Sequence, residues 1–412
     1  MAAKQTLAIG DTGAELVSKF NNNSGLAANV KVYNVEDYGA VHNGSTDDTV
    51  AIQAAITACN SGGGGVIYFP IGIYVIGGAL VGTTGGATYN SQLIIPFVDN
   101  NDETRKTFHL LGEVCPNFSQ SSGINDSGIT HIAPSTGVIL KSTVAGSGTN
   151  PSVICGGKYN ATTALWGNGN ANQIIVENIQ IQPVVDGDVA VTIGGLNLRG
   201  CLDTVVKNVC CFPFNTNIVD TAVPKNNCVG IAMPIFGCSN HNMIEKCNVG
   251  GFETGYRFGE HTSFKDLVAI GCLYGYEQPI NYQLCKGERI GSYWCANNII
   301  FTGGDSNIKI DALQVEWYDG AKWFDTVQTV LDTSNYGHGE IHYNITEMGV
   351  GFNNAKFSKS GGANLQCLPI AFTAAASFTV TGVRDSPEAA LKNLLTVLAA
   401  KGIIVDSTTE TT

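Results

Sequence analysis

The sequence has little charge for its length. Only 14% of its 412 residues are charged, against roughly 25% in typical globular proteins, and the formal net charge is -12. No run of Lys or Arg offsets this acidic balance, so nucleic acid phosphates and anionic membrane surfaces would repel the chain. We therefore expect no nucleic acid partner and no membrane insertion.

Long apolar runs are also missing. No window approaches the ~18 apolar residues that a membrane-spanning helix needs. The first residues, MAAKQ, lack the apolar stretch of a secretion signal. We expect a soluble product that is synthesised in the cytoplasm.

The 13 cysteines follow no metal or disulfide pattern. Their number is odd, no C-x-x-C occurs, and Cys210 and Cys211 are adjacent instead of being spaced as zinc ligands are. Thiols stay reduced in the cytoplasm. We expect most cysteines to be buried and reduced, and we expect no metal site and no cofactor.

Two common catalytic motifs are absent. The glycines at 62–65 follow a predicted helix instead of opening one, and no Gly-Lys-Ser/Thr comes after them, which excludes a phosphate-binding P-loop. No G-x-S-x-G occurs, which argues against a serine hydrolase of that type.

Glycine and small polar residues are abundant instead. The 50 glycines, with many Asn, Ser and Thr, favour a β-rich body with many turns. From Lys31 the stretch "VKVYNVEDYGAV" alternates apolar and polar residues, as a half-buried strand does. The stretch "TDDTVAIQAAI" at 46–56 then predicts a helix of about three turns that ends at the glycine run.

Two neighbouring carboxylates open that helix. Asp47 and Asp48 lie where unpaired backbone N–H groups and the helix dipole favour oxygen atoms and negative charge. A helix cap contributes about 1 kcal/mol, which explains both residues without any chemistry. We interpret them as structural and not as the acid pair of an active site.

Residues 32–76 also carry a family resemblance. The motifs D-Y-G-A, N-G-S-T-D-D-T, A-I-Q-A-A-I, G-G-G-G-V-I-Y-F-P and G-I-Y follow one another in this order. This segment resembles the opening module of pectate-lyase superfamily β-helix proteins, which are common among bacteriophage tailspikes and tail fibres. The resemblance implies an all-β fold, a right-handed parallel β-helix capped by a short amino-terminal helix. It implies activity only weakly, because one scaffold can serve lyases, hydrolases and adhesins.

Short strands separated by Asn or Gly turns continue to about residue 310. Displacing residues 242–259 onto residues 262–279 aligns Ile244 with Phe264, and Lys246 with Asp266. Apolar positions meet apolar ones and a charge meets its opposite, as stacked coils require. Periodicity before residue 172 is poorer, which indicates long loop insertions.

One cluster of this repeat offers chemistry. The same displacement stacks Tyr256 on Tyr276 and Arg257 on Glu277. Aromatic faces, carboxylates and Arg are the groups that bind sugars, so we predict a glycan-binding stripe made of Tyr256, Arg257, Glu260, Tyr276 and Trp294. The alternative is a tyrosine stack with an Arg–Glu pair that only braces two coils.

A catalytic interpretation uses the same cluster. Glu253 and Glu277 lie in adjacent coils, where one carboxyl group could act as acid and the other as nucleophile or base in glycoside hydrolysis. Arg257 could instead stabilise the charge that develops during β-elimination of a uronate.

The carboxyl-terminal part changes character. Longer aromatic-rich stretches after residue 310 predict antiparallel strands in a small β-domain at 311–384. In the segment 385–412, Ser386 and Pro387 begin a helix with a leucine stripe that ends at Gly402. An isolated helix cannot bury such a stripe, which favours a threefold contact between copies over an intramolecular cap.

These patterns predict four segments and a function. The segments are an attachment peptide at 1–31, a β-helix at 32–310, the β-domain at 311–384 and an oligomerisation helix with its tail at 385–412. We expect a homotrimeric bacteriophage virion appendage, exposed on the particle and joined to other virion proteins through its amino-terminal segment. It would recognise host surface polysaccharide; the alternatives are a polysaccharide lyase or glycoside hydrolase, and a purely structural virion protein.

Overall fold

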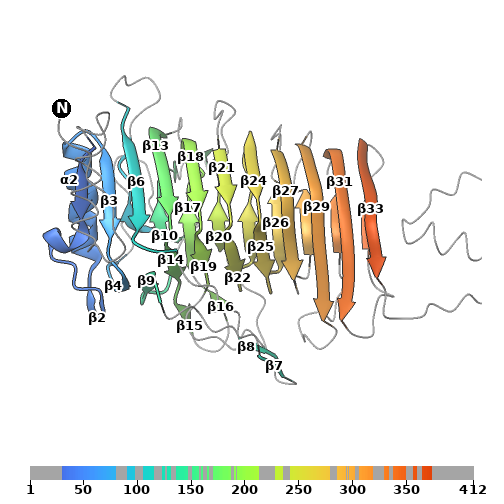
Figure 1. Cartoon of the computed structure of the whole chain (residues 1–412), viewed down its shortest axis with the longest axis horizontal. Helices are drawn as coiled ribbons and strands as arrows, with labels where there is room; N and C mark the ends of the chain where they lie inside the picture. The colour runs from blue at the N-terminus through green and yellow to red at the C-terminus, as the bar shows by residue number, and fades with distance from the viewer. Residues whose placement is uncertain are drawn as a thin grey trace, which may run out of the picture.

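The chain forms a right-handed parallel β-helix (Figure 1). A computed structural model describes residues 30–373 except for 80–90, 98–104, 116–122, 126–127, 131–135, 147–150, 157–158, 161–164, 167–169, 187–189, 192, 213–227, 235–241, 279–284, 294, 296, 302–305, 319–328, 334–336, 349–355 and 360–363. The predicted attachment peptide, except for its last two residues, and the predicted carboxyl-terminal helix lie outside these residues. None of the described residues forms a helix long and apolar enough to cross a membrane.

Three strand-built faces surround one core. Face 1 consists of β1 (Val32–Asn34), β3 (Gly65–Phe69), β6 (Thr107–Gly112), β13 (Asn170–Glu177), β18 (Cys201–Lys207), β21 (Asn242–Glu245), β24 (Thr262–Lys265), β27 (Cys285–Tyr293), β29 (Ser306–Tyr318), β31 (Gly337–Met348) and β33 (Asn364–Thr373). Face 2 consists of β2 (Asn43–Asp47), β4 (Gly72–Ile76), β9 (Val138–Ser142), β14 (Gln180–Gln182), β19 (Cys210–Cys211), β22 (Asn248–Gly250) and β25 (Leu267–Ile270). The long strand β27 pairs with both β24 and β25 and so joins these two faces.

Face 3 is a separate sheet. It consists of β5 (Ser91–Ile94), β10 (Ser152–Cys155), β17 (Gly194–Asn197), β20 (Val229–Ala232), β23 (Thr254–Arg257), β26 (Tyr274–Gln278), β28 (Asn297–Phe301), β30 (Thr329–Thr333) and β32 (Lys356–Lys359). All pairings within the three faces are parallel, and each strand pairs with its equivalent in the next coil.

Antiparallel pairing among the described residues occurs only in short hairpins that leave the coils. These are β7 (Gly123–Asn125) with β8 (Gly128–Thr130), β11 (Tyr159–Asn160) with β12 (Leu165–Trp166), and β15 (Val185–Asp186) with β16 (Ala190–Val191). The first two lie before residue 172, where the poor periodicity predicted insertions.

The amino-terminal end is covered by helix α2 (Thr49–Ser61), which follows the short 3-10 helix η1 (Val35–Tyr38) (Figure 1). Ile52 and Ile56 of α2 are fully buried, whereas Val50 is 80% exposed. Covering the open end of a solenoid in this way shields the apolar interior of the first coil.

The two aspartates before α2 are structural, as predicted, although they act differently from a simple cap. The Asp47 carboxylate accepts hydrogen bonds from the backbone N–H groups of Thr49 and Gly77, both at 3.0 Å. Asp48 is 1% exposed, and its two oxygens accept the N–H groups of Val41 at 2.7 Å and His42 at 3.2 Å. The Asp48 side chain therefore stabilises the preceding turn and does not cap an N–H group of its own helix.

The corner between faces 1 and 2 repeats one backbone conformation. Asn178, Asn208, Lys246 and Asp266 all have positive φ angles, between 52° and 60°. Asn and Asp tolerate this left-handed region better than most residues. The side chain of Asn208 also donates to that of Asn178 at 2.9 Å, which links two neighbouring coils.

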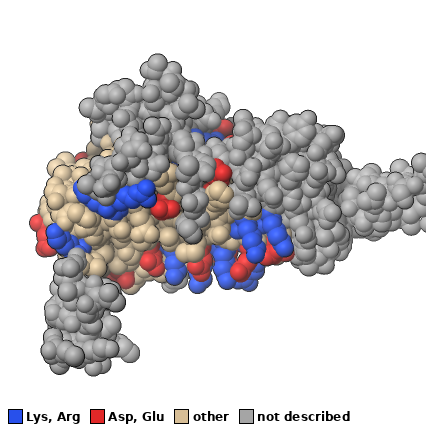
Figure 2. Space-filling model, turned by 90° about the horizontal axis from the view of Figure 1, so that it is seen from above, with Lys and Arg blue, Asp and Glu red and all other residues tan. Residues whose placement is uncertain are grey.

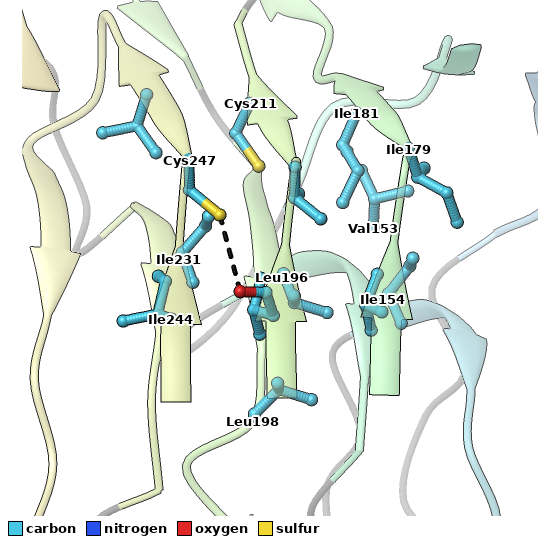
Figure 3. Close-up of a cluster of buried hydrophobic side chains, with 14 of the residues drawn as sticks. Val153, Ile154, Ile179, Ile181, Leu196, Leu198, Cys211, Ile231, Ile244 and Cys247 are labelled. Carbon is cyan, nitrogen blue, oxygen red and sulfur yellow. Dashed lines mark hydrogen bonds between the residues drawn. The ribbon is translucent and has the colours of Figure 1, made fainter. Parts of the chain in front are cut away.

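Stacked aliphatic and sulfur side chains fill the core (Figure 3). Leu196 and Ile231 are register partners on face 3, and Cys211 and Cys247 contribute from the opposite wall. The eleven cysteines whose side chains the structure describes are free thiols, and all of them except Cys115 are buried. Cysteine thus acts here as a small core side chain.

The prediction of antiparallel strands beyond residue 310 is wrong. Strand β29 pairs in parallel with β27, β31 pairs in parallel with β29, and β33 pairs in parallel with β31. The predicted boundary at residue 310 falls inside β29, and the β-helix pairing continues across it. These strands are long because each one continues through the corner at which earlier coils separate a face 1 strand from a face 2 strand.

Candidate functional site

The predicted cluster lies on and beneath face 3. Its register is as predicted, because Tyr256 pairs with Tyr276 and Arg257 pairs with Glu277 between β23 and β26. The structure therefore brings these four residues together in neighbouring coils. Their orientation decides which of them a ligand can reach.

The two tyrosines cannot form a sugar-binding surface, which corrects the prediction. Tyr256 is 0% exposed and Tyr276 is 1% exposed. The Tyr256 hydroxyl donates to the carbonyl oxygen of Cys247 at 2.6 Å, and the Tyr276 hydroxyl donates to that of Gly291 at 2.8 Å. Both rings cross the interior and bond to the opposite wall, so they are core residues.

Arg257 and Glu277 form a closed ion pair. The Nε of Arg257 lies 2.7 Å from Oε2 of Glu277, and their side chains are 12% and 11% exposed. The hydroxyl of Thr254 donates to the same carboxylate oxygen at 3.2 Å. Since each charge already has its partner, this geometry matches the alternative in which the pair braces two coils.

The two candidate catalytic glutamates are not level with each other. Glu277 lies beside Arg257, four residues further along the strand direction than Glu253. Glu253 precedes β23, so the register does not place the two carboxyl groups opposite each other.

The other predicted residues are separate from this pair. The backbone carbonyl of Glu260 accepts a hydrogen bond from the side chain of Asn242 at 3.0 Å, and the Glu260 carboxylate lies 4.0 Å from Nδ1 of His261. Trp294 lies outside the described residues.

A different set of charges lies on the outer side of face 1. Glu177, Lys207, Glu245 and Lys265 are register neighbours in successive coils, so their charges alternate along the rod. Lys265 continues the series through an ion pair of 2.8 Å to Glu288. Basic and acidic side chains alternate along one edge of the described surface in Figure 2.

A shallow depression of about 260 Å³ opens in this face. It is lined by Met243, Glu245, Ser263, Phe264, Lys265, Lys286, Gly287 and Glu288, which come from β21, β24 and β27. Gly287 lacks a side chain, and the ring of Phe264 occupies the space that a Cβ there would need. Phe264 is only 3% exposed, so a side chain at Gly287 would point into the core.

Sequence reasoning missed this depression. The displacement of 242–259 onto 262–279 aligns Met243 with Ser263 and Glu245 with Lys265, so the register was available. The sequence alone does not show the direction of each side chain. It also does not show that β27 pairs with β24, because the displacement by 20 residues ends before β27.

No metal site is evident in the part of the chain that the structure describes. In these residues no three His, Cys, Asp or Glu side chains are grouped so that they could hold a metal ion. The burial of Cys59 and Cys285 raises the pKa of each thiol to about 11, which disfavours the thiolate that a metal would need.

The amino-terminal module matches a known family model. Residues 32–94 match the model described as rhamnogalacturonase A/epimerase, pectate lyase-like. The chain is a β-helix protein with a pectate lyase-like amino-terminal module. This match and the strand pairing agree with the fold that the motifs at 32–76 imply.

Individual relatives share only part of their length with this β-helix protein. Mannuronan C5-epimerase AlgE3 of Azotobacter vinelandii is 44% identical over 63 residues, which is 15% of this chain and 3% of that protein. Alginate lyase 7 of the same organism is 46% identical over 63 residues, which is 15% of this chain and 7% of that protein. The β-helix protein thus spans a small fraction of the curated relatives that it matches.

Solved structures are similar at low identity. The pre-mature gene product 12 of bacteriophage phi29 aligns over 76% of this chain and 42% of its own, with 13% identity and a TM-score of 0.41. ORF18 of Geobacillus virus E2 aligns over 88% of this chain and 64% of its own, with 16% identity and a TM-score of 0.37.

Proposed function

We propose that this protein is a bacteriophage virion appendage that recognises a host cell-surface glycan with the outer surface of its β-helix. One observation carries the proposal: the pectate lyase-like module at 32–94, which resembles proteins named for polysaccharides, opens a solenoid whose outer rows are polar and charged. A polymeric ligand that lies along such a rod can make similar polar contacts with each successive coil.

The placement on a virion rests on the sequence. The motifs at 32–76 resemble the opening module of phage tailspikes and tail fibres. The segment 1–31 would attach the protein to other virion components, and the leucine stripe at 385–412 would hold a homotrimer. A solution mass of three times the 43.3 kDa chain would support this arrangement, and a monomer would count against it.

Catalysis is the second candidate function. It is favoured by the names of the relatives, an epimerase and a lyase that act on mannuronan and alginate according to those names. The Arg257–Glu277 ion pair weighs against Glu277 as its catalyst, because that carboxylate already has a partner. A structural virion protein without any ligand is the third candidate.

Binding and turnover can be separated with one preparation. The full-length protein is applied to an array of bacterial surface polysaccharides, and the same polysaccharides are assayed for new reducing ends and for the ultraviolet absorbance of unsaturated uronates. We expect retention without product. Product formation would favour the enzyme, and silence in both assays would favour a purely structural role.

A further inference from the structure

The depression on face 1 contains a cation without a partner. Lys286 is exposed and makes no ion pair within the described part of the chain. Its neighbours are paired: Lys265 with Glu288 at 2.8 Å, and Arg289 with Asp266 at 2.6 Å. An anion that enters the depression would therefore meet one uncompensated positive charge.

We infer that this depression binds the carboxylate of an acidic sugar, through Lys286 and Ser263. The inference deepens the proposed function, on which it rests, by assigning a site and a ligand class. Met243, Ser263 and Lys286 are register neighbours across β21, β24 and β27. They place an apolar contact, a hydroxyl and an ammonium group in one row.

Each member of this row matches one part of a uronate. The side chain of Met243 is exposed for a large apolar residue, at 38%, and can cover the CH surface of a sugar ring. The exposed Ser263 hydroxyl has no hydrogen-bond partner within the described residues, so it is available to a ligand oxygen. Lys286 supplies a charge-assisted hydrogen bond to the carboxylate.

The neighbouring row matches the hydroxyl groups. Glu245, Lys265 and Glu288 border the same depression; Lys265 is paired with Glu288 at 2.8 Å, and Glu245 is paired at 3.6 Å with Lys246, which lies outside the depression. Carboxylates accept hydrogen bonds from sugar hydroxyls, and Lys265 can donate to a ring or hydroxyl oxygen. This row can therefore make polar contacts with an uncharged part of the ligand.

The arrangement also suits a polymer. Adjacent coils are about 4.8 Å apart, so a chain parallel to the rod axis meets a new coil with each short step. Lys309 is the register neighbour of Lys286 in the next coil; its side chain is 48% exposed and lies 3.6 Å from the carboxylate of Asp311. A polyuronate could thus place a second carboxylate near a second lysine.

The test compares polygalacturonate with its methyl ester. Both polymers have the same backbone, and esterification removes the charge. We expect the full-length protein to bind polygalacturonate about tenfold or more tightly than the ester, and Lys286→Ala to lose the same factor, since one charge-assisted hydrogen bond contributes on this order. Lys286→Arg should retain most of the binding.

Lys207→Ala is the matched control. It removes the same side chain from face 1 but lies in β18, outside the depression, and it should change affinity less than about twofold at physiological salt because of screening. Equal binding of both polymers, wild-type affinity in Lys286→Ala, or an equal loss in Lys207→Ala would overturn the site. If the array yields only uncharged ligands, the site is wrong while the proposed function stands; if it yields none, the proposed function fails.

Discussion

Tyr256 and Tyr276 stack inside the β-helix, with ring centroids 5.2 Å apart and ring planes inclined by 8°. Phe258 joins them, since its ring centroid lies 6.4 Å from that of Tyr256 and 5.7 Å from that of Tyr276. The stack is thus an aromatic core column, and aromatic pairs of this kind contribute about 0.5–1.5 kcal/mol beyond the area that they bury.

Tyr276→Phe should lower stability without touching ligand binding. The variant keeps the ring but removes the donor to the carbonyls of Gly291 and Leu267, so these buried acceptors lose a partner. We expect the free energy of unfolding to fall by about 1–2 kcal/mol in a urea titration. A loss of glycan binding at unchanged stability would contradict the interior placement.

Arg257→Ala should be more costly than removal of the whole pair. The single change leaves Glu277, whose side chain is 11% exposed, as a charge without its ion-pair partner. We expect a loss of about 3 kcal/mol, and a smaller loss in Arg257→Leu/Glu277→Leu, where no charge is left. Urea unfolding of Arg257→Leu, Glu277→Leu and the double variant measures the coupling. Additive losses would mean that the two side chains do not interact.

Gly287→Ala should disturb the packing of Phe264. A Cβ at this position would overlap the Phe264 ring, which is itself stacked on Phe258 at a centroid distance of 4.6 Å. We expect a destabilisation of about 1–3 kcal/mol from overpacking. Adding Phe264→Leu makes room, so the double variant should be more stable than the sum of the single losses predicts. Strict additivity would argue that the ring does not lie beneath Gly287.

Asp47 should make stability depend on pH in the acid range. Its burial raises the pKa, but hydrogen bonds from Thr49 and Gly77 outweigh that effect and hold the pKa below the ordinary value of 3.8. A carboxyl group with a lowered folded-state pKa stabilises the protein above its unfolded pKa, and this stabilisation is lost as the pH falls through the folded pKa. Asp47→Asn should therefore be less stable than wild type at pH 7, and the difference should shrink below about pH 4. A difference that is constant with pH would contradict this account.

Alkylation should distinguish one cysteine from the others. Cys115 is exposed, whereas the other ten cysteines whose side chains the structure describes are buried, and burial raises the pKa of Cys210 and Cys228 to about 12. Iodoacetamide should modify Cys115 in the native protein and reach the buried thiols only after unfolding, as mass spectrometry of the peptides can show. Rapid native labelling of Cys272 or Cys295 would contradict the packed core.

The sequence was sufficient for the class of fold and for local register. The motifs at 32–76 identified the module, and the 242–259 displacement correctly paired Ile244 with Phe264 and Arg257 with Glu277. Both inferences depend on repetition, and repetition in a solenoid is visible in the sequence because each coil pairs with the next one.

The repeat in the sequence does not predict whether a given side chain faces the core or the solvent. A repeat shows that Tyr256 stacks on Tyr276, but each coil bends at its corners, and a bend changes which residues of the next strand face inward. Gly287 shows the same limit, because its consequence depends on the ring of Phe264 in the neighbouring strand. The expectation of antiparallel strands beyond residue 310 is wrong for a related reason: long aromatic-rich stretches suggest a new sheet, whereas β29 and β31 extend the existing one.

The most direct test is an experimental structure of the full-length protein with a bound oligogalacturonate. We predict sugar density on face 1 between Met243 and Lys286, with a carboxylate oxygen within hydrogen-bond distance of the Lys286 ammonium group. Sugar bound at Arg257 and Glu277 on face 3, with the face 1 depression empty, would contradict the account.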